Sequence, residues 1–267
     1  MGARRSWWQR ILYSELSRPV LMMVILLVLW DVAIRLFKIP PYLIPAPDKV
    51  VGQLIAEWPR LWRESMTTTY ATLGGFGMSI VFGIPMAMLI AYSRTVESFI
   101  YPLLVFSQSI PKIAIAPLFV VWFGFGIIPK IIAAFLLGFF PIVVATVMGF
   151  KSVEADMLDL ARSMQASRWQ TFIRISLPHA LPSIFSGLKV SVTLAVVGAV
   201  VGEFVGSNSG IGYVLQIANG NFDLPLMFAA LVVLSMIGVI LFVAIDMIER
   251  WAIPWHAAHR NEFSPTP

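Results

Sequence analysis

Long apolar runs without charged residues constrain this chain more than any other feature. Met66 to Tyr92, Ile131 to Phe150 and Leu224 to Ile245 contain no Asp, Glu, Lys or Arg. A helix of about 20 apolar residues crosses the hydrocarbon core of a bilayer. The chain is 58% hydrophobic and 12% charged, whereas soluble domains average about 45–50% apolar and about 25% charged residues. Too few charges remain to cover a soluble core. The composition therefore excludes an ordinary soluble enzyme, a disordered chain and a nucleic-acid-binding module, and it predicts an all-α membrane protein.

Three further segments have the length of a span but carry one or two charges each: Val20 to about Phe37, Phe99 to Phe125 and Ile184 to Gly202. The first is the weakest, because Asp31 and Arg35 interrupt its far end. These two residues are four apart and are expected to pair across one helical turn. We therefore favour six transmembrane helices, with five as the main alternative.

The distribution of Lys and Arg predicts the orientation, because short cytoplasmic loops are enriched in these residues. The bias favours placing both termini in the cytoplasm. On this interpretation residues 1–19 form a cytoplasmic N-terminal segment, residues 20–250 the transmembrane domain and residues 251–267 a cytoplasmic tail. The proline-rich stretch Ile39 to Pro47 is expected to be extended chain outside the membrane, and Ile211 to Ala218 is expected to form a small helix on the outer face.

Small residues recur at four-residue spacing in two predicted spans. The second span contains Ala71, Gly75, Ser79, Gly83, Ala87 and Ala91, and the fifth contains Gly198, Gly202 and Gly206. Such stripes allow helix backbones to approach closely in a membrane. Packing within the chain is the simpler interpretation. The alternative is that one stripe lines an interface with a second copy of the chain or faces a substrate path.

Charges within spans are costly and mark candidate functional sites. Lys112 lies mid-span between Pro111 and Pro117, two prolines that are expected to kink or break the helix. Glu203 lies near the outer end of the fifth span, and Lys189 near its inner end is expected to reach the interface with its ammonium group. Two interpretations of Lys112 and Glu203 remain open: they act in the pathway or in a gating ion pair, or they form a purely structural ion pair. The candidate pathway or gate residues are Pro111, Lys112, Pro117, Gly198, Gly202 and Glu203.

The inner loop of residues 151–182 separates the fourth and fifth spans. Its acidic residues precede its basic ones, an order that complements a helix dipole. A short amphipathic helix is predicted up to about Trp169, with a new helical start at Ser167 and an end at Leu177-Pro178. Such a helix suits docking into a groove of another protein. It equally suits lying on the bilayer surface.

This loop resembles the "EAA" loop of permeases from binding-protein-dependent ABC importers. The resemblance rests on Asp159-Leu160-Ala161 with Arg162, on Ala166-Ser167-Arg168-Trp169, and on Leu177-Pro178. Two positions depart from the family pattern: the triplet is Asp-Leu-Ala, and Gln165 replaces the family glycine. Other stretches, among them Ser109 to Lys112, Ala116 to Gly124 and Ser209 to Gly212, resemble the nitrate/sulfonate/taurine branch. That branch includes permeases for pyrimidine thiamin precursors and riboflavin.

The resemblance implies a type I ABC importer permease with six transmembrane helices and cytoplasmic coupling helices, in a bacterial inner membrane. It implies a second permease copy, two cytoplasmic ATPase subunits that bind Mg-ATP, and a soluble or lipid-anchored substrate-binding protein, besides membrane lipid. No nucleic-acid partner is expected, on the composition given above. No cofactor is expected in this chain, since the sequence has no G-x-x-x-x-G-K-[ST] loop with which to bind ATP itself. The residues expected to couple to the ATPase are Asp159, Leu160, Ala161, Arg162, Gln165, Ala166, Ser167, Arg168, Trp169, Leu177 and Pro178.

Two other classes of protein are alternatives to an ABC importer permease. An intramembrane enzyme needs clustered nucleophiles or metal ligands within its spans. Here the three histidines, His179, His256 and His259, lie in the inner loop and the tail. A stand-alone channel or secondary transporter remains an alternative, although secondary carriers usually show inverted repeats and the two halves of this chain do not match. The expected substrate is a small solute of the sulfonate, taurine or nitrate type, and a lone Lys112 is compatible with such an anion but does not by itself select it. The alternative is that the same machinery imports a pyrimidine thiamin precursor or riboflavin.

Overall fold

The computed structural model describes residues 17–255, which form helices and connecting turns without a strand. Most of the predicted N-terminal segment and tail, including His256 and His259, lies outside the described residues. The helices are α2 (Ser17–Leu36), α3 (Pro47–Ala56), α4 (Trp58–Tyr92), α5 (Arg94–Ser109), α6 (Lys112–Phe123), α7 (Ile127–Lys151), α8 (Ala155–Ser163), α9 (Arg168–Thr171), α10 (Leu177–Gly206), α11 (Ile211–Gly220) and α12 (Leu224–Ala252).

Within the described residues, four helical segments are long and apolar enough to cross a membrane: α4, α7, the run Arg168–Gly206 and α12. The bent pair formed by α5 and α6 makes a fifth if it is counted as one span. The helix α2 has 20 residues, which at about 1.5 Å per residue is close to the thickness of the hydrocarbon core. It occupies the place of the predicted first span. Its Asp31 and Arg35 form the expected ion pair, at 2.8 Å.

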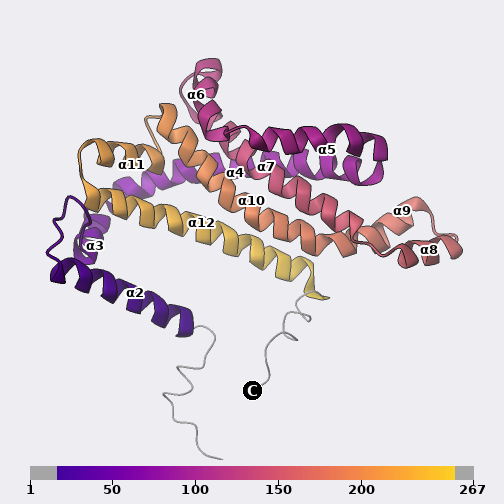
Figure 1. The fold of residues 1–267 in the computed structure, drawn as a ribbon, viewed down its shortest axis with the longest axis horizontal. Coiled ribbons are helices and arrows are strands. Elements are labelled where there is room, and N and C mark those ends of the chain that lie inside the picture. Colours follow the sequence, from indigo (N-terminus) through magenta and orange to yellow (C-terminus); the bar gives the residue numbers. More distant parts are fainter. Residues whose placement is uncertain (1–16, 256–267) are drawn as a thin grey trace, which may run out of the picture.

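The long helices lie roughly side by side, with the short helices gathered at two opposite ends of the bundle (Figure 1). The helices α8 and α9 lie at one end, here called the coupling-loop end. The helices α3 and α11 lie at the other, here called the α11 end. The predicted small helix of residues 211–218 is confirmed as α11. The stretch Ile39 to Pro47 is not extended throughout as predicted, because it contains a turn in which the amide of Leu43 donates to the carbonyl of Pro40 at 2.9 Å. The helix α3 was not predicted either, and Pro47 starts it in the first-turn position that proline tolerates.

The centre of the bundle is α7, which packs most extensively against α10 and α4. The stripe of small residues on α4 is buried there: a Cβ atom on Gly75 would lie only 2.4 Å from the Cβ of Ala134. The hydroxyl of Ser79 donates to the carbonyl of Phe135 at 3.1 Å. On α10, Gly198 and Gly202 approach the α7 backbone as closely. In this structure these small residues therefore pack helices of the same chain against one another.

Gly75→Ala is expected to destabilise the bundle by about 1–3 kcal/mol, because the added methyl group forces α4 and α7 apart. Gly77→Ala is the matched control on the same helix, since its Cβ would meet no atom within 4 Å. That change is expected to be neutral or stabilising by up to about 1 kcal/mol. Thermal unfolding of both variants in one detergent measures the difference. Equal melting temperatures would mean that the close contact at Gly75 does not hold the helices together.

The predicted third span is broken, as the two prolines indicated. The helices α5 and α6 meet at an angle of 93°. The break falls at Ile110 and Pro111, whereas Pro117 lies inside α6. Most of the apolar side chains of both helices, including Phe106 and Val121, are exposed. This elbow therefore leaves an apolar surface uncovered by the chain itself.

Candidate functional site

The coupling loop consists of two short helices joined by a tight turn. Its first helix, α8, begins beside Asp156 and ends near Arg162, so charges of suitable sign lie at both ends of the helix dipole. Asp159 and Arg162 form an exposed ion pair at 2.7 Å. Ala161, at the end of the triplet, is buried. The loop thus holds its own shape while most of its side chains remain exposed.

Gln165 occupies the turn in a left-handed conformation, with φ at 56°. Glycine adopts this region without a steric cost, which explains why the family pattern has glycine there. The turn is closed by the amide of Ala166, which donates to the carbonyl of Ala161 at 3.0 Å. The replacement of glycine by Gln165 therefore leaves the turn in place.

The second helix of the loop starts at Ser167, as predicted. Its hydroxyl accepts from the amide of Gln170, and the Gln170 side chain accepts from the amide of Ser167 in return. This reciprocal arrangement is a capping box, which satisfies two amides at the helix start. It fixes the direction in which Arg168 and Trp169 leave the turn.

The predicted helix end at Leu177-Pro178 is wrong. Phe172–Ser176 forms a turn of π-helix that leads directly into α10. Pro178 lies in the first turn of α10, where its missing amide is tolerated. The helical run from Arg168 to Gly206 is therefore continuous. The second helix of the loop is thus joined to α10 without an intervening non-helical linker.

A set of aromatic rings joins the loop to two other spans. Trp169 stacks on Phe172 with ring centres 5.7 Å apart, and Phe172 stacks on Phe150 of α7 at 5.9 Å. Tyr92, at the end of α4, contacts both Phe150 and Phe172. The loop is thus packed against α4 and α7 as well as being continuous with α10.

The loop also presents apolar side chains to its surroundings. Leu160 is 63% exposed and Trp169 is 67% exposed, and Met157 and Met164 are exposed beside them. We call these four residues the docking surface. Exposed apolar side chains on short helices at the end of a bundle, here α8 with its C-cap and α9, are typical of a surface that another protein covers.

The predicted pathway residues fall into two groups. Pro111, Lys112 and Pro117 lie at the elbow and in α6, and the ammonium of Lys112 lies 5.9 Å from the ring centre of Phe140. Gly198, Gly202 and Glu203 are buried between α10 and its neighbours. The cation nearest Glu203 is Lys130, at 3.9 Å, so the ion pair considered for Lys112 and Glu203 is not the one that forms. A pathway role for the six residues stays a prediction.

Four buried polar residues at the α11 end were not predicted as a group: Glu64 and Thr68 from α4, Lys130 from α7 and Glu203 from α10. We call them the α11 polar cluster. Glu203 was recognised alone, because it is a charge within a span. Its partners are remote in the sequence, and the only available signal was that Glu64 and Lys130 flank apolar runs.

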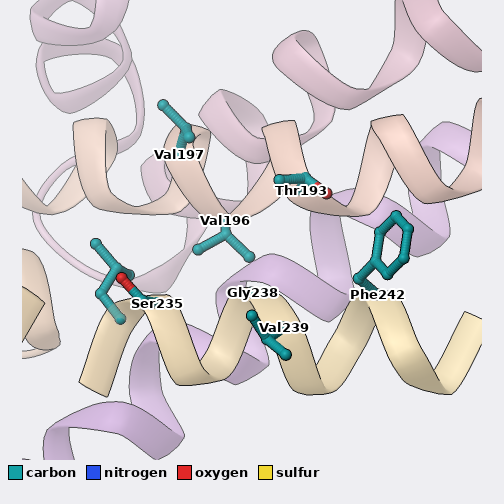
Figure 2. A pocket seen from close by; sticks show the side chains of 8 residues that line it. Thr193, Val196, Val197, Ser235, Gly238, Val239 and Phe242 are labelled. Atoms are coloured by element: carbon teal, nitrogen blue, oxygen red, sulfur yellow. The ribbon is translucent and has the colours of Figure 1, made fainter. Parts of the chain in front are cut away.

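A groove of about 480 Å³ lies between α10 and α12. Figure 2 shows Thr193, Val196 and Val197 on one side and Ser235, Gly238, Val239 and Phe242 on the other. The two hydroxyl groups in it donate to carbonyls of their own helices. The groove therefore presents an almost wholly apolar surface, which does not suit a small polar solute.

Taken together, the helical bundle, its broken span and its exposed coupling loop define an integral membrane permease of the type I ABC importer fold. Residues 79–254 match the family model described as "Binding-protein-dependent transport system inner membrane component". The chain belongs to this family of multi-pass inner-membrane proteins, as the resemblance of its loop predicted.

Similar proteins cover nearly the whole chain. The formylaminopyrimidine transport permease protein ThiX of Halalkalibacterium halodurans is 40% identical over 89% of this chain and 95% of its own length. The riboflavin transport system permease protein RibX of Chloroflexus aurantiacus is 36% identical over 94% of both chains. The taurine transport system permease protein TauC of Escherichia coli is 27% identical over 96% of both chains.

The fold also matches a solved structure, an inward facing conformation of the MetNI methionine ABC transporter. The TM-score is 0.63 at 20% sequence identity, over 73% of this chain and 97% of the matched chain. The likeness supports the all-α permease fold.

Proposed function

We propose that this chain is the membrane-spanning subunit of an ATP-driven importer and carries no catalytic residue itself. Two permease copies form the path, two ATPase subunits bind Mg-ATP beneath them, and a binding protein delivers the solute. The observation that carries the proposal is the exposed docking surface, whose residue Trp169 lies on a helical run that continues into a span, while its other three residues lie on α8 and its C-cap, one tight turn before that run. An exposed apolar face on a rigid lever suits a motor subunit that must move the span.

The proposed orientation places the coupling-loop end in the cytoplasm and the α11 end outside. The helix directions support this orientation for a chain with both termini in the cytoplasm: α2 runs toward the α11 end, and α12 runs from there toward the coupling-loop end (Figure 1). The apolar elbow of α5 and α6 is the surface we assign to contact with the second copy, because its exposed side chains face no other part of the chain.

The substrate we favour is a small heterocycle of the pyrimidine or flavin type. The permeases named for formylaminopyrimidine and riboflavin are 40% and 36% identical to this chain, whereas the taurine permease is 27% identical. This preference departs from the sulfonate, taurine or nitrate class that the sequence alone favoured, which remains the second candidate. We expect a binding-protein gene beside the gene for this chain, and titrations of that binding protein with formylaminopyrimidine, riboflavin, taurine and nitrate distinguish the two classes.

Uptake into proteoliposomes tests the function. Vesicles that hold this permease with its ATPase are expected to accumulate the solute only when ATP is inside them and the binding protein is outside. Vesicles that hold the permease alone are the control, and they are expected to show no accumulation against a gradient. Uphill uptake by the permease alone would contradict the proposal and favour a secondary transporter.

A further inference from the structure

Side chains of the α11 polar cluster accept hydrogen bonds from the backbone amides at the start of α11. The amide of Gly210 donates to Glu64 at 2.7 Å, that of Ile211 to the hydroxyl of Thr68 at 2.8 Å, and that of Gly212 to Glu203 at 2.7 Å. The first amides of a helix have no partner within the helix. Here three successive amides are satisfied by side chains that come from two other helices.

The side chains of the cluster are also bonded to one another. The hydroxyl of Thr68 donates to Glu203 at 2.8 Å while it accepts from Ile211. The ammonium of Lys130 lies 3.9 Å from Glu203 and donates to the carbonyl and the hydroxyl of Ser209, at 2.8 and 3.1 Å. One turn of connecting chain is therefore bound by groups from α4, α7 and α10.

The charges of the cluster balance within the protein. Glu203 faces Lys130, and Glu64 pairs with the exposed Arg63 at 3.1 Å. Glu203 and Thr68 are fully buried. Buried carboxylates are costly unless they are paired and hydrogen-bonded, and here both conditions are met without a bound ion.

The fit around the loop is tight. Gly210 has a φ of 103°, and a Cβ atom there would lie 2.0 Å from the carboxylate of Glu203. A residue with a side chain is excluded on both grounds. The loop therefore has one position relative to the cluster, and α11 begins in that position.

We propose that Glu64, Thr68, Lys130 and Glu203 are positioning residues that fix α11 to α4, α7 and α10, so that the outer end of the permease moves with these spans as one body. The transport consequence rests on the proposed function. The same three spans are joined to the coupling loop by its aromatic contacts and by the continuous α10. The spans α4, α7 and α10 are thus attached to the coupling loop at one end and, through the cluster, to α11 at the other.

Hydrogen exchange resolved to single amides tests the cluster on the purified full chain. The amides of Gly210, Ile211 and Gly212 are expected to exchange slowly, although they lie at a helix start. Thr68→Val is expected to raise exchange at Ile211 by about tenfold or more, the effect of losing one buried hydrogen bond. Thr72→Val is the matched control: Thr72 is as buried and lies one turn further along α4, but its hydroxyl donates only to the carbonyl of Thr68.

Two milder variants keep the test decisive if Thr68→Val folds poorly. Glu64→Gln is expected to raise exchange mainly at Gly210, and Glu203→Gln mainly at Gly212, because each carboxylate holds a different amide. General destabilisation would raise exchange at all three amides alike. Fast exchange in the wild type, or equal effects of Thr68→Val and Thr72→Val, would overturn the proposal.

The transport consequence is measured separately. With Thr68→Val, the ATPase is expected to co-purify as with the wild type, while uptake in the proteoliposome assay falls. Unchanged uptake with raised exchange at Ile211 would overturn the positioning role. The exchange pattern is measured on the permease alone. If the wild type shows the pattern but never imports solute, the proposed function fails and the assignment of the cluster stands.

Discussion

Leu160→Glu is expected to abolish co-purification of the ATPase while the permease remains folded. Leu160 lies on α8 in the docking surface and is 63% exposed, so a carboxylate there is solvated and harmless in the isolated chain. In the complex the same carboxylate would be buried against an apolar groove. We expect a loss of at least about 3 kcal/mol of binding free energy, which is more than a hundredfold in Kd. Pull-down of a tagged permease, with transport measured in parallel, checks this result.

Ile55→Glu is the matched control for this change. Ile55 is an aliphatic residue on the short helix α3, at the opposite end of the bundle, and it is 71% exposed. The same substitution there adds the same charge and is expected to leave ATPase binding unchanged. If the ATPase co-purified normally with the Leu160→Glu permease, the predicted docking role of α8 would be wrong. Equal losses with both variants would point to a fault in membrane insertion.

Two local features were predictable because each depends on residues close together in the sequence. The helix start at Ser167 rests on a capping box whose two residues are three positions apart, and the break at Pro111 follows from the chemistry of proline alone. The stripe from Ala71 to Ala87 was predictable for a similar reason, since a four-residue period describes one face of a helix.

The α11 polar cluster was beyond such reasoning. Glu203 and Thr68 are 135 positions apart, and their contact depends on which faces of α4 and α10 turn inward. Hydropathy locates a span but does not specify its rotation. For this reason Glu203 was assigned Lys112 as a candidate partner, whereas the packing of α7 against α10 brings Lys130 to it.

Lys189 shows the same limit at the coupling-loop end. Its ammonium was expected to reach the membrane interface. It pairs instead with Asp246 and Glu249 of α12, because α12 continues to Ala252, beyond the apolar run that ended at Ile245. The extra turns bring two carboxylates to a lysine that the sequence places 57 residues away from Asp246.

Lys189→Met is expected to destabilise the bundle strongly. The three side chains are 5–16% exposed, and Lys189 contacts both carboxylates, whereas the exposed Arg250 pairs with Asp246 alone. Removing one partner from a buried ion pair costs about 3–5 kcal/mol, or a drop of about 6–20 °C in melting temperature for a chain of this size. Thermal unfolding in detergent measures this loss. Lys151→Met is the control, because it breaks the more exposed pair of Lys151 with Glu97, which is worth about 1 kcal/mol or less.

A triple variant separates charge from packing at this site. Adding Asp246→Asn and Glu249→Gln to Lys189→Met removes the two carboxylates that have lost their contact with Lys189, and it is expected to recover part of the lost stability. The recovery is partial because Asp246→Asn also breaks the pair of Asp246 with Arg250, at 2.8 Å. A triple variant as unstable as Lys189→Met would show that the lysine acts through its packing against Phe242, whose ring centre lies 5.7 Å from the ammonium. Recovery would show that the loss in Lys189→Met comes from carboxylates left without the lysine, rather than from a change in packing between α10 and α12.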